Sequence, residues 1–211
     1  MSRVLIIGGS GRTGRLIADE AKRLGHDVTI TARDPRRVTD EGTVPQGIGL
    51  VHADVHDPAS VLAAVKNTDA VIVAVSSSAR GSGSVYSDAA RAVIGAVAPG
   101  TRVIVVSSGG VARDDKGLPL WWFRRILTPL FMNDLYTDMK VMEDMFRASE
   151  LDWTIVRASY LKDGPGGGEI RISDGSNPRG GWKLSRHDLA AFVAAQLNTE
   201  EWSRRLPTLA Q

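Results

Sequence analysis

The sequence predicts an α/β fold, a Rossmann-like, doubly wound parallel sheet. Two observations predict it. Apolar runs of four to six residues alternate with amphipathic stretches of about ten to fifteen, which is the pattern of successive strand–helix–strand units. Turns rich in Gly and Ser follow several of the apolar runs. In open α/β sheets, ligands bind beyond the carboxyl ends of the strands, so these turns are the expected place for a site.

The composition is that of an ordinary folded protein. The 211 residues are 43% hydrophobic and 24% charged, and this length favours a single domain, 1–211. The absence of cysteine excludes disulfides and thiolate chemistry. A net charge of only +2 argues against a nucleic-acid partner. There is no run of about 18 apolar residues that would span a membrane. The chain starts directly with a strand rather than a leader segment, so a cytoplasmic protein is expected.

The first turn carries the strongest functional signal. The apolar run 4–7 leads into Gly8-Gly9-Ser10-Gly11-Arg12-Thr13-Gly14, and an amphipathic stretch follows that closes at Gly25. Glycine lets the backbone turn tightly and approach a phosphate, and the free N–H groups at the start of a helix face its charge. The Gly9-x-Gly11-x-x-Gly14 spacing also satisfies the Rossmann fingerprint. We therefore expect all seven loop residues to hold a dinucleotide.

The end of the second predicted strand, Asp27–Ala32, bears on the choice of cofactor. In NAD-selective sites an acidic residue near this point accepts bonds from the ribose hydroxyls. Here the strand ends in Arg33, whose guanidinium suits a 2′-phosphate, and Arg12 can close on the same group. The sequence therefore favours NADP(H) over NAD(H). Asp34 is an alternative partner for a ribose hydroxyl.

The segment from Arg36 to residue 66 is predicted to contain a loop, a short strand and a helix. Arg36 and Arg37 are equally well explained as the solvated start of a helix. Residues 38–49 are expected to form a loop before a short third strand, 50–53. Asp54 ends that strand and is placed to meet the adenine amino group. Asp57 is a plausible N-cap for a helix over 58–66. His52 and His56 have no third ligand at metal spacing, so no metal site is predicted.

Two further strands are expected to be buried on both faces. The runs 70–75 and 102–106 are continuously apolar, as is typical of parallel strands covered by helices. Ser76-Ser77-Ser78 and the loop 79–83 follow the first run, before a helix over 85–98. The second run delivers Ser107 and Ser108 to the same edge as the glycine loop.

The rest of the chain is less regular. Residues 112–132 contain Trp121-Trp122-Phe123, which would serve as a substrate wall, a dimer contact or ordinary packing. A helix is expected over 134–149 and a sixth strand over 153–156, followed by Arg157. Two short strands, Glu169–Ser173 and Trp182–Leu184, are expected around a turn. Ser185-x-x-Asp188 resembles a capping box that opens a last helix through Leu197. Residues 158–185 are therefore predicted to be a small substrate-side appendage.

Three side chains form a candidate catalytic set. Tyr136 and Lys140 are four residues apart, so they project from one face of the predicted helix. A nearby ammonium favours the phenolate form of tyrosine, which then exchanges a proton with a carbonyl or alcohol oxygen. A hydroxyl from Ser108 would hold that oxygen. An interfacial tyrosine and a solvated lysine remain an alternative interpretation of the pair.

These motifs together carry a family resemblance. The Gly8-x-x-Gly11-x-x-Gly14 loop, Asp54, Ser107-Ser108, Tyr136-x-x-x-Lys140 and the Leu151–Arg157 stretch resemble the atypical short-chain dehydrogenase/reductases. Within these, the chain is similar to the NAD(P)H-binding group that includes NmrA-like proteins and biliverdin/flavin reductases. The resemblance extends to Ser185–Ala190. The chain has Ala158 where relatives often have proline.

The resemblance implies both a topology and a set of contacts. It implies strand order 3-2-1-4-5-6. It also implies that the cofactor contacts the following residues besides the glycine loop: Arg33, Asp54, Val55, Ala74, Val75, Ser76, Arg157 and Ala158. We expect Ser107 and Lys140 to contact the cofactor as well, with Lys140 holding the nicotinamide ribose. Relatives differ in function, since some use Ser, Tyr and Lys catalytically, some reduce flavins without the tyrosine and some only bind dinucleotide.

The favoured function is therefore an NADPH-dependent oxidoreductase of the short-chain dehydrogenase/reductase type. Its small-molecule substrate would be a planar carbonyl compound, quinone or flavin. Two alternatives remain, a non-catalytic NADP(H) sensor of NmrA type and a cofactor-assisted epimerase or isomerase. No nucleic-acid or membrane partner is expected, and the protein is expected to be a monomer or a homodimer.

Overall fold

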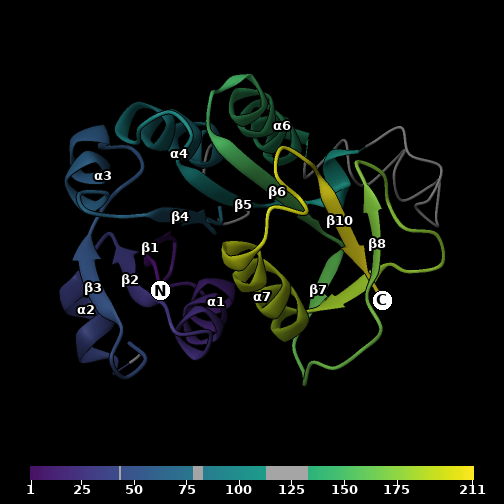
Figure 1. Ribbon diagram of the computed structural model, residues 1–211, viewed down its shortest axis with the longest axis horizontal. Helices are drawn as coiled ribbons and strands as arrows, with labels where there is room; N and C mark the ends of the chain where they lie inside the picture. Colours follow the sequence, from purple (N-terminus) through teal and green to yellow (C-terminus); the bar gives the residue numbers. More distant parts are fainter. Residues whose placement is uncertain (43, 78–82, 113–132) are drawn as a thin grey trace.

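The computed structural model describes residues 1–42, 44–77, 83–112 and 133–211. Its main sheet contains β1 (Arg3–Ile7), β2 (Asp27–Ala32), β3 (Gly49–His52), β4 (Ala70–Val73), β5 (Arg102–Ser108), β6 (Asp152–Ala158), β8 (Arg171–Asp174) and β10 (Pro207–Ala210). Their order is β3-β2-β1-β4-β5-β6-β10-β8 (Figure 1). All neighbours are parallel except β8, which is antiparallel to β10. The Rossmann-like prediction and the 3-2-1-4-5-6 order are thus confirmed, and two more strands extend the sheet beyond β6.

Helices cover both faces of this sheet. They are α1 (Arg12–Arg23), α2 (Pro35–Asp40), α3 (Pro58–Ala64), α4 (Val85–Ala96), α6 (Asn133–Ala148) and α7 (Arg186–Ala195). In Figure 1, α3, α4 and α6 lie along one face, and α1 and α7 lie side by side on the other. Within the described residues, no helix is both long and apolar enough to cross a bilayer.

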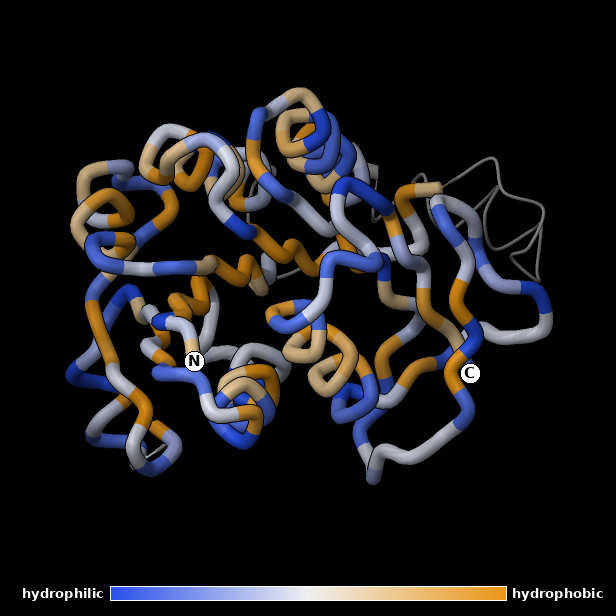
Figure 2. The backbone as a smooth tube through the Cα atoms, in the orientation of Figure 1, coloured by the Kyte–Doolittle hydropathy of each residue, from blue (hydrophilic) through white to orange (hydrophobic). Residues whose placement is uncertain are grey.

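The alternation of side chains along β1 shows how the two cores form. Leu5 and Ile7 pack in the cluster under α3, α4 and α6, whereas Val4 and Ile6 pack in the cluster under α1 and α7. Since successive side chains of a strand point to opposite faces, a continuously apolar strand supplies both cores. Figure 2 shows the same pattern, with hydrophobic colour along the central strands.

Local sequence signals set several helix boundaries. The Asp57 carboxylate accepts from the Ala59 N–H (3.1 Å) and caps α3, with Pro58 at the first helical position, as predicted. Asp34 caps α2 through the Arg37 N–H (3.3 Å). Gly25 follows Leu24, the C-cap of α1, and has φ +88°, a conformation that favours glycine. The N–H groups of Gly25 and His26 return to the Lys22 and Ala21 carbonyls, which is a Schellman motif.

The C-terminal part pairs differently from the prediction. Strands are present at β8 and at β9 (Lys183–Ser185), but they do not pair with each other around a turn. Strand β8 pairs with β10, and β9 pairs in parallel with β7 (Tyr160–Lys162). The predicted appendage is therefore divided, because β8 joins the main sheet and β7–β9 form a small second sheet. Strand β10 was not expected, since it has only four residues and starts at Pro207.

Only half of the predicted capping box is formed at α7. The Ser185 hydroxyl accepts from the His187 N–H (3.2 Å), as a cap should. Asp188 does not return to the Ser185 N–H, which donates instead to Gln211 Oε1 (3.2 Å). The Asp188 carboxylate accepts from the Gly167 N–H (2.6 Å) and from Gln211 Nε2 (2.5 Å). Tertiary partners have thus replaced the local one.

Candidate functional site

The glycine loop is shaped by three close approaches. Gly8 has φ +80°, and a Cβ built on it would lie 2.6 Å from the Ala74 carbonyl oxygen. A Cβ on Gly9 would lie 2.5 Å from the Ile30 Cβ, and one on Gly14 would lie 2.7 Å from the Gly9 Cα. These glycines therefore let the turn pack against β2, β4 and α1 at distances that no side chain allows. The loop consequently lies directly beside the end of β4.

Gly11 leaves the start of α1 open. It is the N-cap residue of α1 and has no side chain to cap the helix, and the first turn contains no acidic residue. By contrast, α2, α3 and α7 each carry a side-chain cap. The first N–H groups of α1 are thus available to an external anion. Ser10, Arg12 and Thr13 lie partly or wholly exposed around this turn. The donor set therefore fits the pyrophosphate of a dinucleotide.

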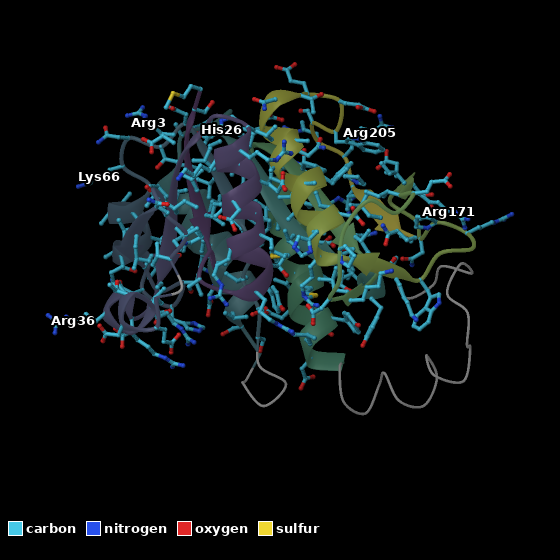
Figure 3. The ribbon with its side chains drawn as sticks, turned by 90° about the horizontal axis from the view of Figure 1, so that it is seen from below. Arg3, His26, Arg36, Lys66, Arg171 and Arg205 are labelled. Carbon is cyan, nitrogen blue, oxygen red and sulfur yellow. The ribbon has the colours of Figure 1, made fainter. Side chains whose placement is uncertain are left out.

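The three arginines that follow β2 differ in their surroundings. Arg33 is exposed and forms no ion pair within the described part of the chain. The Asp34 carboxylate is used in capping α2. Arg37 pairs with Glu41 (2.8 Å) on the exposed side of α2, and Arg36 points outward in Figure 3. Within the described residues, Arg33 and Arg36 therefore both lack an ion pair, and Arg33 is the one that directly follows β2.

The ends of β3 and β4 supply the next predicted residues. Asp54 is half-buried, and its carboxylate accepts from the His56 N–H (3.0 Å) in a local turn. Val55 is buried in the core. Ala74 and Val75 run past Gly8, since a Cβ on Gly8 would lie 2.9 Å from the Val75 nitrogen. The exposed Ser76 follows them. Ala74 and Val75 are thus brought to the glycine loop. Ser78 lies outside the described residues.

Two of the predicted cofactor residues share a buried carboxylate that the sequence analysis missed. Ser107 Oγ donates to Glu143 Oε1 (2.7 Å). Arg157 donates from Nε to Oε1 (3.0 Å) and from Nη2 to Oε2 (2.5 Å), and its Nη1 reaches the Gly175 carbonyl (2.9 Å). All three side chains are buried, as is Ala158. The side chains of Ser107 and Arg157 therefore hold β5, β6 and α6 together beneath the site.

A signal for Glu143 was present in the sequence. Met139, Met142 and Phe146 of α6 are buried at helical spacing, and Glu143 lies within that apolar stripe. A carboxylate on the buried face of a helix requires a cationic or hydrogen-bonding partner. That partner could have been sought in Arg157, the charged residue at the end of a buried strand.

Ser108 and Tyr136 meet at Gly110. The Ser108 hydroxyl accepts from the Gly110 N–H (3.2 Å). A Cβ built on Gly110 would lie 2.5 Å from Cζ and 2.7 Å from the hydroxyl oxygen of Tyr136. The tyrosine ring therefore lies directly on the turn that carries Ser108, as the candidate catalytic set requires. The aromatic cluster Trp121-Trp122-Phe123 lies outside the described residues.

The same turn is held from its other side by a residue that the sequence analysis did not identify. Asn177 is buried, and its Nδ2 donates to the Gly109 carbonyl (3.2 Å). A Cβ on Gly109 would overlap Asn177 Oδ1. Asn177 thus fixes the turn after β5 from the β8 side of the molecule. No local pattern marks it, because the contact joins residues 68 apart.

Lys140 has a partner on its own helix. Its ammonium donates to Asp144 Oδ2 (2.8 Å), in an ion pair that is more than half exposed on both sides. Lys140 is one turn from Tyr136 along the same helix, as predicted, but the carboxylate it contacts is a further turn away. The structure therefore brings Ser108 and Tyr136 together and turns Lys140 toward Asp144.

Close to Tyr136, two further buried residues, Asp138 and Tyr86, are joined by a hydrogen bond that the sequence analysis did not predict. Asp138 accepts from the N–H groups of Tyr86 (2.9 Å) and Ser87 (3.2 Å) in the first turn of α4. Tyr86 is buried, and burial raises the pKa of its phenol. Its hydroxyl accepts from the Ser77 N–H (3.3 Å). This pair ties the segment after β4 to α4 and α6, and so supports one wall of the site.

A hollow of about 360 Å³ lies elsewhere. It is lined by residues of β1, β2, β3 and the end of α3, among them Arg3, Asp27 and Lys66. In Figure 3, Arg3 and Lys66 lie away from Arg36, toward the amino-terminal ends of the strands. None of the predicted site residues lines this hollow. Its position therefore gives it no part in the site at the glycine loop.

The sheet order and the open glycine loop define a nucleotide-binding protein of the Rossmann class. A profile described as NAD(P)H-binding matches residues 8–200. The chain therefore belongs to the NAD(P)H-binding family of atypical short-chain dehydrogenase/reductases, as the sequence motifs predicted. The description of this family names NAD(P)H as the ligand and does not distinguish NADP from NAD.

Relatives are similar over different lengths. An uncharacterized protein of Bacillus subtilis (strain 168), YwnB, is 26% identical over 210 residues, which are 94% of this chain and 93% of that protein. Phenylcoumaran benzylic ether reductase IRL1 of Ginkgo biloba is 39% identical over 80 residues, which are 35% of this chain and 26% of that protein. The match thus spans about a quarter of the plant reductase.

The fold is shared with solved structures. A short-chain dehydrogenase/reductase from Veillonella parvula DSM 2008, in complex with NADP, superposes with a TM-score of 0.78. The match covers 100% of this chain and 94% of that chain, at 17% sequence identity. At this identity the similarity shows the fold alone.

Proposed function

We propose that the protein is an NADPH-dependent oxidoreductase that reduces a small, planar carbonyl compound, quinone or flavin. The observation that carries the proposal is the meeting of Ser108 and Tyr136 at Gly110, beyond the carboxyl end of β5. The glycine loop and the end of β4 lie beyond the ends of neighbouring strands. This arrangement suits a reductase that uses a Ser–Tyr set, since the dinucleotide loop would lie on one side of the substrate and the two hydroxyl groups on the other. The matched plant reductases support an activity of this type.

Each residue then has a distinct task. Bound NADPH supplies the hydride. Ser108 holds the acceptor oxygen of the substrate through its hydroxyl, and Tyr136 donates a proton to that oxygen as negative charge develops on it. Lys140 favours proton release from Tyr136 once its ammonium leaves Asp144. Asn177 and Glu143 keep the turn and the ends of the strands in position from below.

Screening acceptors with wild-type protein tests the proposal. We expect NADPH oxidation to be accelerated by at least one member of a panel of quinones, free flavins and aromatic aldehydes, measured as loss of absorbance at the reduced nicotinamide band. The Gly14→Ala variant should lose this activity, because its new Cβ would overlap the loop backbone. A folded wild-type protein that binds NADPH but oxidises it with no acceptor would contradict a reductase function.

The preference for NADPH is proposed from Arg33. Replacing Arg33 with alanine is expected to weaken NADPH binding by about ten- to hundredfold, since a charge-assisted bond to the 2′-phosphate contributes about 1.5–3 kcal/mol. NADH binding should change by less than about twofold. Arg36→Ala is the matched control, because it removes the same charge from an exposed neighbouring position. Titration calorimetry gives both affinities, and equal losses for the two coenzymes would refute the assignment.

A second candidate function is a non-catalytic NADP(H) sensor. The contact of Lys140 with Asp144 favours it, because the third member of the catalytic set is then turned away from the proton donor. A sensor needs only the dinucleotide loop and a change that a partner protein can detect. Dinucleotide binding without turnover on any acceptor of the panel would support it.

A further inference from the structure

One exposed carboxylate links the glycine loop to the neighbouring helix α7. Asp163 follows β7, and its Oδ2 lies 3.3 Å from Nη1 of Arg12 in the loop. Its Oδ1 lies 2.5 Å from Nη1 of Arg186 at the first position of α7. Helices α1 and α7 pack side by side (Figure 1). These three side chains therefore bridge the starts of both helices. Asp163 therefore places a carboxylate against an arginine of the predicted phosphate site.

The two contacts of Asp163 are unequal. The Arg186 side chain is only 14% exposed, whereas those of Arg12 and Asp163 are 69% and 71% exposed. The segment after Asp163 is also anchored on α7, since His187 Nδ1 donates to the Gly164 carbonyl (2.9 Å) and the Gly167 N–H donates to Asp188 (2.6 Å). The contact with Arg186 is thus the fixed one, and the contact with Arg12 is the one that can be exchanged.

The charges in this group do not balance. One carboxylate serves two guanidinium groups, both permanently charged. A phosphate on Arg12 would balance the set, with Asp163 retained by Arg186. The free N–H groups at the start of α1 lie in the same loop as Arg12 and favour the same anion. The group therefore carries enough positive charge to bind one more anion. That anion would compete with Asp163 for Arg12.

We propose that Asp163 is an internal competitor that sets the affinity for the dinucleotide. It occupies Arg12 when no dinucleotide is bound, and a phosphate group of the dinucleotide displaces it while Arg186 keeps it in place. The inference rests on the dinucleotide site of the proposed function but not on hydride transfer. Removing the carboxylate removes this competition for Arg12. An exposed pair of this kind corresponds to about a two- to fivefold change in affinity.

The test is calorimetric titration of NADP⁺ and NAD⁺ into purified wild-type, Asp163→Asn and Glu169→Gln proteins. Glu169 is an exposed carboxylate of the same connection and has no ion pair within the described residues, so its variant controls for net charge. We expect Asp163→Asn to bind NADP⁺ about two- to fivefold more tightly than wild type, and Glu169→Gln to bind as wild type does. A gain for NADP⁺ alone identifies the 2′-phosphate as the competing group, and an equal gain for NAD⁺ identifies the pyrophosphate.

A double-mutant cycle separates this effect from others. In an Arg12→Gln background, Asp163→Asn should bring no further gain, because the arginine for which it competes is absent. The inference would be overturned if Asp163→Asn bound NADP⁺ no more tightly than Glu169→Gln does. It would also be overturned if Asp163→Asn raised the affinity by the same factor in the Arg12→Gln background. A gain in affinity in a protein that turns over no acceptor would support the inference and refute the reductase function. A wild-type protein that binds neither dinucleotide would overturn both.

Discussion

Replacing Tyr136 with phenylalanine is expected to lower kcat by about 10²- to 10⁴-fold, which is the usual contribution of a positioned proton donor. The change removes one oxygen from a ring that lies on Gly110, and leaves the packing of the ring in place. The Kd for NADPH should stay within about twofold of wild type, because the glycine loop and Arg33 are untouched. Turnover with the best acceptor and fluorescence titration with NADPH measure the two quantities.

The matched control is Tyr160→Phe. Tyr160 is 67% exposed on β7, so loss of its hydroxyl should leave kcat unchanged. The kcat of Tyr136→Phe should also lose the dependence on pH that a proton donor gives to the wild-type profile. An unchanged kcat in Tyr136→Phe, with intact NADPH binding, would show that hydride is delivered without the tyrosine. The role of Ser108 would then need to be tested separately.

The largest loss of stability is expected for Glu143→Gln. This change leaves the Arg157 guanidinium buried without its anion, and removing one partner of a buried ion pair costs about 3–5 kcal/mol. Urea denaturation followed by circular dichroism measures the free energy of unfolding. The amide can still accept from Ser107, so the loss should come from the uncompensated charge rather than from the hydroxyl contact.

Two further variants test whether the loss of stability comes from the buried ion pair. Asp144→Asn breaks the exposed pair with Lys140 on the same helix and should cost less than about 1 kcal/mol. The double variant Glu143→Gln/Arg157→Gln should be more stable than Glu143→Gln alone, because no buried charge is left unpaired. A single variant as stable as Asp144→Asn would contradict the proposed importance of the buried pair. If Glu143→Gln does not fold, recovery of folding in the double variant still tests the argument.

Local patterns explain how much of the fold could be predicted. The bounds of β2 match the prediction, because Asp27 and Arg33 enclose an apolar run. Asp57-Pro58 and Gly25 mark helix ends through caps that involve only neighbouring residues. The sequence could predict the tight turn of the glycine loop for the same reason, since its motif spans only a few residues.

Long-range contacts explain what could not be predicted. Strand β8 pairs with β10, which comes more than thirty residues later, and no pattern within either strand identifies its neighbour. Asn177 reaches Gly109, and Gln211 takes the place of the Ser185–Asp188 bond. In the site, Ser108 and Tyr136 were identified from their chemistry. The competing carboxylate at Asp163 was not, because only the folded chain brings it to Arg12.

The position of β10 has a consequence for the order in which the protein folds. The final strand lies between β6 and β8, and β8 has no other strand neighbour in the described sheet. The strands β1 to β6 can assemble through connections along the chain, but β8 can dock only after residues 207–210 have paired with β6. Contacts of large sequence separation form slowly because long loops must close first. The dinucleotide half should therefore be complete early, with the region around Asn177 settling onto it last.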